Sequence, residues 1–307
     1  MANSLNGMAE HYREMLADPT YIELLGVHDV LSALIGEATG FKAVFASGYG
    51  IAASLFGNPD IGLTTLTETA LASKNMITRL PKTPVIVDVD NGYGNEDNVI
   101  RTIREMEFSG AAGVIMEDQV LPKRCGHTAN KMILNLPFYM KKLEYAMKAR
   151  ETPLVITART DAADLDEAIM RAKTFHSAGA DLTLIDGVKT LDALKRIGAE
   201  VPGHKQVNLI YGGLTPPLSA VELNKIGFKV ILYSTPTLFV AARALWEWLP
   251  RLRETHDLKA IAEGSVDFKN FQKFIEDIYV SRMRDQGFDT PQRREATGKF
   301  VTIIDKR

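Results

Sequence analysis

Three carboxylates follow short apolar runs in a pattern that suggests divalent-metal chemistry. Asp88 and Asp90 follow the run Pro84–Val87, and Glu117 follows the run Gly113–Met116. On neighbouring parallel strands these like charges would repel unless they shared a proton or a cation. Mg²⁺, or Mn²⁺ in its place, takes oxygen ligands and keeps several waters, whereas Zn²⁺ ligands at metal spacing are missing. Helix capping is the alternative for an isolated Asp-x-Asp, and Glu117 argues against it.

The sole cysteine stands in a segment that suggests proton transfer. Lys123 and Arg124 precede Cys125, and Gly126 and His127 follow it. Nearby positive charge lowers a thiol pKa, and a glycine lets a loop bend over a substrate. A lone cysteine is otherwise a small buried hydrophobe. The charged neighbours favour a functional thiol in a mobile loop.

Other apolar runs also end in polar or ionisable side chains. These are His28-Asp29, Ser47-Gly48-Tyr49-Gly50, Arg159-Thr160-Asp161, Asp186, Tyr211 and Tyr233-Ser234, and Asn208 lies within the run that precedes Tyr211. Chemistry in an α/β barrel is located at the carboxyl ends of its strands, so this placement predicts one shared site.

Eight short apolar runs alternate with helix-length segments, which predicts an α/β fold, a (β/α)₈ TIM-type barrel, with a doubly wound open sheet as the alternative. Gly110, Gly179 and Gly227 stand where helices should end. The runs are Leu24–Val27, Ala43–Ala46, Pro84–Val87, Gly113–Met116, Leu154–Ala158, Leu182–Ile185, Gln206–Ile210 and Lys229–Leu232.

The domain pattern changes towards the C-terminus. Residues 1–255 are predicted to form the barrel with an N-terminal helix, and residues 256–307 a C-terminal helical extension of the same domain. Appendages of this kind pack on a neighbouring subunit in many barrels. We therefore expect a homo-oligomer.

Composition limits the class of protein. The 36 Lys and Arg balance 38 Asp and Glu without a basic stripe, which argues against nucleic acid or a membrane surface as a partner. The single cysteine allows no intramolecular disulfide and favours a reducing compartment. The first residues do not have the pattern of a signal peptide, and no run is long enough to span a membrane. We expect a soluble cytoplasmic protein.

Four motifs in order resemble the isocitrate lyase/phosphoenolpyruvate mutase superfamily, from about Gly26 to Leu249. The Lys-Arg-Cys-Gly-His motif is similar to its lyase branch, which includes 2-methylisocitrate and 2,3-dimethylmalate lyases. The motifs are Asp88-Val89-Asp90-Asn91-Gly92-Tyr93-Gly94-Asn95, Glu117-Asp118-Gln119, Lys123-Arg124-Cys125-Gly126-His127 and Ala158-Arg159-Thr160-Asp161.

The resemblance implies a Mg²⁺-dependent carbon–carbon lyase, with a helix exchanged between paired subunits in a dimer of dimers. Its substrate would be a small 2-hydroxy di- or tricarboxylate, cleaved through an enolate that Cys125 protonates. Metal ligands would be Asp60, Asp88, Asp90 and Glu117, and Arg159, His127 and Asp186 would join Cys125 as catalytic residues. Substrate contacts would come from Ser47, Gly48, Tyr49, Lys123, Arg124, Asn208, Tyr211 and Thr215.

Four positions depart from the lyase pattern. Phe45 replaces a tyrosine, Asp186 a glutamate, Tyr211 an acidic residue and Leu214 a basic residue. These changes predict a less charged distal pocket and a substrate other than the familiar ones.

Several other functions share parts of this pattern. Oxaloacetate hydrolysis would use the same metal and thiol. Phosphoenolpyruvate mutase activity is disfavoured, because the mutase branch has no such thiol. The segment Gly48–Ala53 fits a relaxed dinucleotide-binding pattern, but Asn58-Pro59-Asp60 interrupts the required βαβ unit. A non-catalytic metabolite-binding protein is a further alternative.

Overall fold

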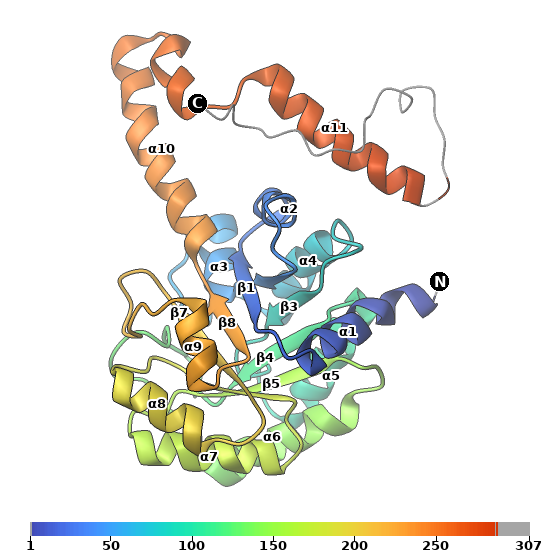
Figure 1. The fold of residues 1–307 in the computed structure, drawn as a ribbon, viewed down its shortest axis with the longest axis vertical. Helices are drawn as coiled ribbons and strands as arrows, with labels where there is room; N and C mark the ends of the chain where they lie inside the picture. Colours follow the sequence, from blue (N-terminus) through green and yellow to red (C-terminus); the bar gives the residue numbers. More distant parts are fainter. Residues whose placement is uncertain (1, 286, 288–307) are drawn as a thin grey trace. The chain divides into compact units, whose positions relative to one another are not determined.

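The computed structural model describes residues 2–285 and 287, and side chains from residue 7 onward. Its eight strands form a closed parallel barrel in sequence order, in which each strand pairs with the next and β8 pairs with β1 (Figure 1). The predicted (β/α)₈ barrel is confirmed. Closure excludes the doubly wound open sheet, because an open sheet has two unpaired edges.

The strands are β1 (Ile22–Val27), β2 (Ala43–Ala46), β3 (Val85–Asp88), β4 (Gly113–Glu117), β5 (Val155–Thr160), β6 (Leu182–Ile185), β7 (His204–Leu209) and β8 (Val230–Tyr233). The helices around them are α1 (Ala2–Ala17), α2 (Val30–Ala38), α3 (Gly48–Phe56), α4 (Leu66–Ile77), α5 (Glu96–Ser109), α6 (Leu136–Ala149), α7 (Leu165–Ser177), α8 (Leu191–Glu200) and α9 (Ala220–Ile226).

Local sequence sets where the helices begin and end. Thr65, Asn95 and Ser219 cap α4, α5 and α9 through their side chains, each in a reciprocal capping box. Gly110 and Gly227 end α5 and α9 with positive φ, the backbone region that glycine enters without steric cost. Because Asn95 caps α5, Asp88 and Asp90 are free of the capping role.

Alternate strand residues fill the barrel interior with apolar side chains. Tyr12 and Leu16 of α1 pack into the same cluster as Leu24 and Val155. Other members of this cluster are the last inward-facing apolar residues of their strands, and above them the interior becomes polar. These are Phe45, Ile115, Leu184 and Leu232. The pocket described below therefore rests on a dry apolar base.

The chain divides into two compact units, residues 1–238 and 239–307. The division falls within α10 (Pro236–Thr255), earlier than the boundary after residue 255 predicted from the sequence. The second unit continues with a 3₁₀ helix, η1 (Leu258–Gly264), and α11 (Phe268–Asp285). Within it, the Trp248 ring occupies the space beside Gly264 that a Cβ would need. The remainder of the predicted extension, residues 286 and 288–307, lies outside the described residues.

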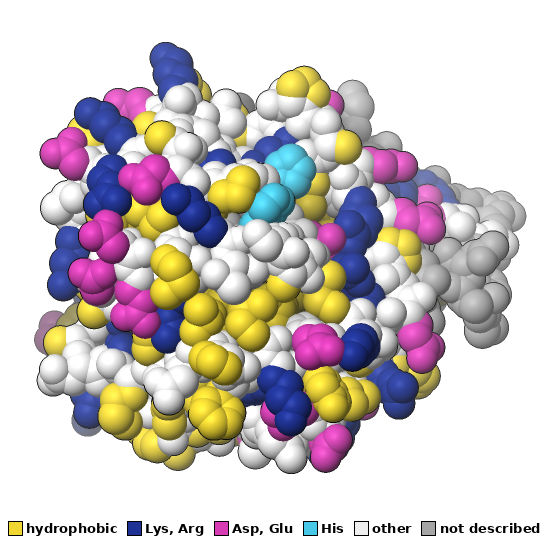
Figure 2. All heavy atoms as spheres, turned by 90° about the horizontal axis from the view of Figure 1, so that it is seen from below, with side chains coloured by type: hydrophobic (Ala, Val, Ile, Leu, Met, Phe, Trp, Pro, Cys, Tyr) yellow, Lys and Arg dark blue, Asp and Glu magenta, His cyan; other side chains and the backbone are white. Residues whose placement is uncertain are grey.

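The surface agrees with a balanced charge composition. On the face drawn in Figure 2, Lys and Arg side chains are interspersed with Asp and Glu side chains. Among the described helices, none combines the length and the apolar character that crossing a membrane requires.

Candidate active site

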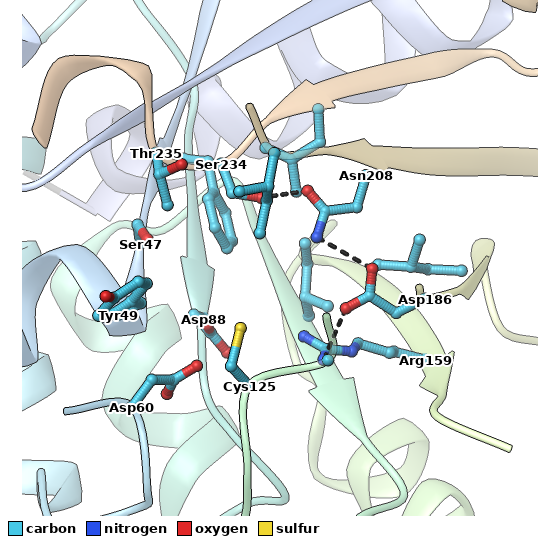
Figure 3. Close-up of a pocket in the computed structure, with 16 residues that line it drawn as sticks. Ser47, Tyr49, Asp60, Asp88, Cys125, Arg159, Asp186, Asn208, Ser234 and Thr235 are labelled. Carbon is cyan, nitrogen blue, oxygen red and sulfur yellow. Dashed lines mark hydrogen bonds and ion pairs between the residues drawn. The ribbon is translucent and has the colours of Figure 1, made fainter. Parts of the chain in front are cut away.

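A pocket opens at the carboxyl ends of the barrel strands, where the sequence predicted the site. Its empty space is about 430 Å³, including solvent at the mouth. Three acidic groups, one guanidinium and the thiol of Cys125 face it (Figure 3). The lining residues are Phe45, Ser47, Tyr49, Asp60, Asp88, Ile115, Cys125, Gly126, Arg159, Leu184, Asp186, Asn208, Ile210, Leu232, Ser234 and Thr235.

Strand register places the charged groups side by side. Asp88 ends β3, and Glu117 ends β4 directly beside Arg159 of β5. The Glu117 N–H donates to the Asp90 carbonyl oxygen at 2.8 Å, which holds the turn after β3 against the end of β4. The three predicted carboxylates therefore converge through backbone pairing, as the sequence indicated.

Burial changes the ionisation of two of these carboxyls. Glu117 is 1% exposed, and neither of its carboxylate oxygens accepts a hydrogen bond. Burial raises its pKa well above the usual range, against the opposing pull of Lys123 and of Arg159, whose Nη2 lies 3.3 Å away. Burial also raises the pKa of Asp90 to about 6. Burial therefore makes the charged form of both carboxyls costly, and a nearby cation or a bound proton would relieve that cost.

Lys123 supplies some of that positive charge. Its buried Nζ lies 3.0 Å from Asp60 and pairs also with Asp90. The sequence assigned Lys123 to substrate binding, but its ammonium is directed into the carboxylate cluster and does not line the pocket. This placement follows from charge, because a buried ammonium needs carboxylate partners.

The four residues predicted to bind the metal, Asp60, Asp88, Asp90 and Glu117, do not form a set of direct ligands. Among the residues that the structure describes, no three Asp, Glu, His or Cys side chains are arranged as direct ligands of one ion. Asp90 turns to Lys123, and Glu117 lies buried behind the pocket wall. Mg²⁺ keeps several waters and needs only one or two carboxylates. Asp88 and Asp60 on the pocket wall, with the two oxygens of Glu117 that accept no hydrogen bond behind them, fit that mode of binding.

A second group of polar side chains runs along the opposite wall (Figure 3). Arg159 Nη2 lies 2.8 Å from Asp186, whose other oxygen accepts from Asn208 Nδ2 at 3.0 Å. The Ser234 hydroxyl donates to Asn208 Oδ1. Burial alone would raise the pKa of Asp186, but Arg159 and His127 outweigh it and hold that pKa below its usual range. Asp186 is therefore a fixed anion that orients Arg159 and Asn208.

The Cys125 loop, residues 121–131, rises from a short antiparallel base. Gln119 pairs with Ile133 there, and the Gln119 side chain makes hydrogen bonds to both backbone groups of Arg124. Gly126 lies against the strand ends so closely that an added Cβ would stand 1.9 Å from Asp186 Oδ2. Only glycine can therefore bring this loop onto Arg159 and Asp186.

His127 holds the same loop from a second direction. Its Nδ1 accepts from the Leu214 N–H at 2.9 Å, and its Nε2 lies 3.4 Å from Asp186 Oδ1. These contacts attach the loop to the segment after β7. His127 does not line the pocket, so its place is that of a support for the loop.

The expected low pKa of the thiol is wrong. Burial raises the pKa of Cys125 to about 11, and the charge of Asp60 adds to this effect. The two cations that precede it do not offset burial, because Lys123 is paired with carboxylates and Arg124 is exposed. Cys125 is thus a protonated thiol facing the pocket, a proton donor rather than a thiolate.

Several predicted substrate contacts lie elsewhere. Tyr211 is 94% exposed and Arg124 is also exposed, so neither faces the pocket. Thr215 is buried but does not line the pocket, and Leu214 contributes its backbone N–H to His127. The segment after β7 turns outward, which separates these side chains from Asn208 on the strand itself.

The turn after β2 is placed as predicted but bonded differently. Ser47 and Tyr49 line the pocket. The Ser47 side chain caps α3 by accepting from the Gly50 N–H, and the Gly48 N–H donates to Asp88 at 3.3 Å. Gly48, predicted as a substrate contact, therefore directs its backbone N–H to a carboxylate of the chain.

Sequence reasoning assigned no role to five contributors to the site. Thr235 and Ser234 bring hydroxyls after β8, and Ile210 adds an apolar side chain. Asp161 accepts two hydrogen bonds from Arg159, at 2.9 and 3.1 Å, and Lys131 contacts Asp161 at 2.9 Å. The sequence had already placed Ser234 and Asp161 at the shared site, since both follow predicted strands. Lys131 had no such signal, because it lies in a loop whose course only the fold determines.

Comparison with known proteins gives a consistent result. The family model described as phosphoenolpyruvate phosphomutase matches residues 12–251. The chain is 36% identical over 271 residues to 2,3-dimethylmalate lyase of Eubacterium barkeri, which covers 87% of this chain and 93% of that protein. It is 36% identical over 237 residues to 2-methylisocitrate lyase of Shewanella oneidensis, covering 76% and 81%. A solved oxaloacetate acetylhydrolase, bound to 3,3-difluorooxalacetate, superposes with a TM-score of 0.86 at 28% identity, covering 92% of this chain and 97% of that one.

Proposed function

This chain belongs to the phosphoenolpyruvate mutase/isocitrate lyase superfamily, and from that premise we propose that it is a Mg²⁺-dependent carbon–carbon lyase. Its substrate is a small 2-hydroxy dicarboxylate. The observation that carries the proposal is the single pocket in which Asp88, Arg159 and the protonated thiol of Cys125 meet. Cleavage next to a carboxylate needs these three functions: binding of the oxo-acid half, stabilisation of negative charge and delivery of a proton.

The reaction is a retro-aldol cleavage. The C2 hydroxyl loses its proton through water to solvent, the C2–C3 bond breaks, and C2 becomes the carbonyl carbon of a 2-oxo acid. The electron pair left on C3 delocalises into the adjacent carboxylate as an enolate. Arg159 is oriented by Asp186 and Asp161, so its guanidinium is held rigid to bind the oxygen on C2.

Protonation of C3 completes the reaction. The thiol of Cys125 faces the pocket and stays protonated because burial raises its pKa to about 11. A group that must donate a proton needs to hold it in the resting enzyme, so the raised pKa suits this role. The thiolate that forms is then reprotonated from solvent when the loop opens.

The metal belongs with the carboxylate wall. Asp88 and Asp60 would hold Mg²⁺ together with waters that reach Asp90 and Glu117. When bound there, the ion supplies positive charge to the oxygens of the 2-oxo acid half. The support is the donor set itself, which is all oxygen and includes two buried oxygens of Glu117 that accept no hydrogen bond.

A dicarboxylate fits the pocket better than a tricarboxylate. Arg159 is the sole cation among the residues that line it, and it is already shared with Asp186. A third carboxylate would meet no second cation, since the rest of the wall combines neutral polar groups with the apolar side chains of Phe45, Ile115, Leu184, Ile210 and Leu232. That wall favours an alkyl substituent, because burying an unpaired charge is costly. The sequence predicted a less charged pocket partly from Tyr211 and Leu214, but neither residue lines the pocket. The apolar side chains of the wall now support that prediction instead.

Hydrolysis of oxaloacetate is the second candidate. The hydrated ketone of a 2-oxo acid carries two oxygens on C2 and needs one more hydrogen-bond partner than a tertiary alcohol. The hydroxyls of Ser234 and Thr235 on the pocket wall can serve that oxygen. The likeness to the oxaloacetate acetylhydrolase structure gives this candidate independent support. Mutase activity has less support, because Cys125 has no place in it.

Assembly and location complete the proposal. The second unit exposes large apolar side chains on α10 and α11, among them Trp246, Val240 and Phe268. Such surface is typical of subunit contacts, so we propose a homotetramer, a dimer of dimers that exchange C-terminal helices. Light scattering of the full chain tests the tetramer. The single cysteine supports a cytoplasmic location.

One substrate screen tests the function. The full chain is incubated with Mg²⁺ and each of 2,3-dimethylmalate, citramalate, 2-methylisocitrate and oxaloacetate, and 2-oxo acid or oxalate release is followed. We expect the highest kcat/KM with an alkylated dicarboxylate and loss of turnover in EDTA, restored by Mg²⁺. Oxalate release from oxaloacetate alone would establish the hydrolase instead. Equal, slow rates for wild type and Cys125→Ser on every compound would exclude both.

A further inference from the structure

The far end of the Cys125 loop carries a cation that points back towards the site. Lys131 Nζ donates to the Gly126 carbonyl oxygen at 2.6 Å and lies 2.9 Å from Asp161 Oδ1. Its side chain is 10% exposed although it belongs to a surface loop. Removing the ammonium of a lysine from water costs free energy. Here the two partners of Lys131 must offset that cost.

The two partners belong to different parts of the site. Gly126 is the residue after Cys125, so its carbonyl fixes the backbone that carries the thiol. Asp161 is fully buried and holds Arg159 through two hydrogen bonds. Lys131 therefore connects the backbone beside the thiol to the carboxylate that orients the guanidinium.

This connection forms only when the loop lies on the strand ends. Gly126 then stands against Asp186 and Arg159, and its carbonyl oxygen packs on Gly187, where an added Cβ would lie 2.6 Å from it. If the loop lifted, Lys131 would lose the Gly126 carbonyl while Asp161 kept its contacts with Arg159. The contact is thus specific to the position of the loop.

We propose that Lys131 is a positioning residue that latches the Cys125 loop over the pocket and sets the thiol relative to Arg159. It touches neither the pocket nor the thiol directly, so it acts through Gly126 and Asp161. The assignment deepens the proposed function, because it explains how the proton donor is kept in place. The contact itself does not depend on which bond is cleaved.

The single cysteine makes the latch measurable without turnover. Alkylation of Cys125 by iodoacetamide requires access to the thiol, and the chain has no other cysteine to react. In the full-length protein at fixed pH, we expect Lys131→Met to be alkylated about tenfold faster than wild type, since charged hydrogen bonds hold the closed loop. Lys131→Arg should stay within about threefold of wild type, because it retains a cation that can donate to both partners.

The direction of the change separates the latch from a charge effect. Removing a nearby cation lowers the thiolate fraction and would slow alkylation. Faster alkylation in Lys131→Met therefore reports an open loop. Lys148→Met is the matched control, because Lys148 is exposed and its partners Glu144 and Tyr145 lie on its own helix. It should be alkylated at the wild-type rate.

Activity and stability give the second readout. With the best substrate of the screen, Lys131→Met should lower kcat more than it raises KM, while its melting temperature stays close to that of wild type. Alkylation of Lys131→Met at or below the wild-type rate would overturn the latch, whatever the activity. If Lys131→Met is unfolded by circular dichroism, Lys131→Gln takes its place with the same expectation. A failed substrate screen leaves the alkylation result readable, so the two proposals fail separately.

Discussion

The pocket is bounded by two regions that are held in place by different means. Asp88, Glu117, Arg159 and Asp186, here called the strand-end floor, stand on or next to strands whose parallel register fixes them. The Cys125 loop has a short backbone base, and above it side chains hold it down, those of Gln119, Lys123, His127 and Lys131.

Substitutions in the floor should alter the charge of the site, whereas substitutions in the loop should alter the position of the thiol. A side-chain change in the floor removes a charge but leaves the backbone in place, because eight strands maintain the ladder. A change in the loop can leave the thiol intact and still displace it, since a few contacts determine where it lies. Substitutions in the two regions should therefore produce different kinetic and structural signatures.

Arg159→Lys tests the floor and should have the largest effect. A lysine cannot keep the two hydrogen bonds to Asp161 and the contact with Asp186 together, so transition-state charge loses a rigid partner. We expect kcat/KM to fall by about 10²–10³-fold. Alkylation of Cys125 should stay near the wild-type rate. Steady-state kinetics on the best substrate of the screen measures kcat/KM. The control is Arg196→Lys, on the exposed face of α8.

Gly126→Ala tests the loop. The added methyl would stand 1.9 Å from Asp186 Oδ2 and 2.4 Å from Arg159 Nη2, so the loop must lift or the Asp186 and Arg159 side chains must move. We expect about a 10²-fold loss of kcat/KM from a misplaced thiol, with rapid alkylation and a nearly unchanged melting temperature. Gly7→Ala, where an added Cβ meets nothing, is the matched control. A large drop in melting temperature would mean that the loop also supports the core, and the contrast between the regions would weaken.

The pH dependence of alkylation tests how deeply the closed loop buries the thiol. Burial raises the pKa of Cys125 to about 11, so the reactive thiolate is scarce at neutral pH and becomes abundant only above pH 10. The alkylation rate should rise about tenfold per pH unit from 7 to 10 without levelling off. A plateau at or below pH 9 would show that the thiol is not desolvated. The Lys131→Met variant should level off at lower pH than wild type.

Tyr211→Ala should have the smallest effect. Its side chain is 94% exposed on the segment after β7, beyond both regions. We expect kcat/KM to change by no more than about twofold. The free energy of unfolding should change by no more than about 0.5 kcal/mol, as for an ordinary surface substitution. A larger change in kcat/KM would place Tyr211 at the substrate and restore the role that the sequence suggested for it.

Much of the floor could be predicted from the sequence alone. Buried parallel strands have apolar runs, and polar residues directly after such runs must meet at one end of a barrel. That reasoning placed Asp88, Glu117 and Arg159 correctly, because backbone pairing converts position along a strand into position in space. The motifs around the same residues were also enough to indicate the family.

The loop and its electrostatics were decided by tertiary structure. Whether Lys123 lowers the pKa of the thiol or neutralises Asp60 and Asp90 depends on where a long flexible side chain finds its partners. Tyr211 follows the predicted strand that contains Asn208, yet the chain turns outward before it. Lys131 acquires its place only because the loop returns to the barrel. Such outcomes depend on burial and on contacts between distant segments, which no local pattern of residues encodes.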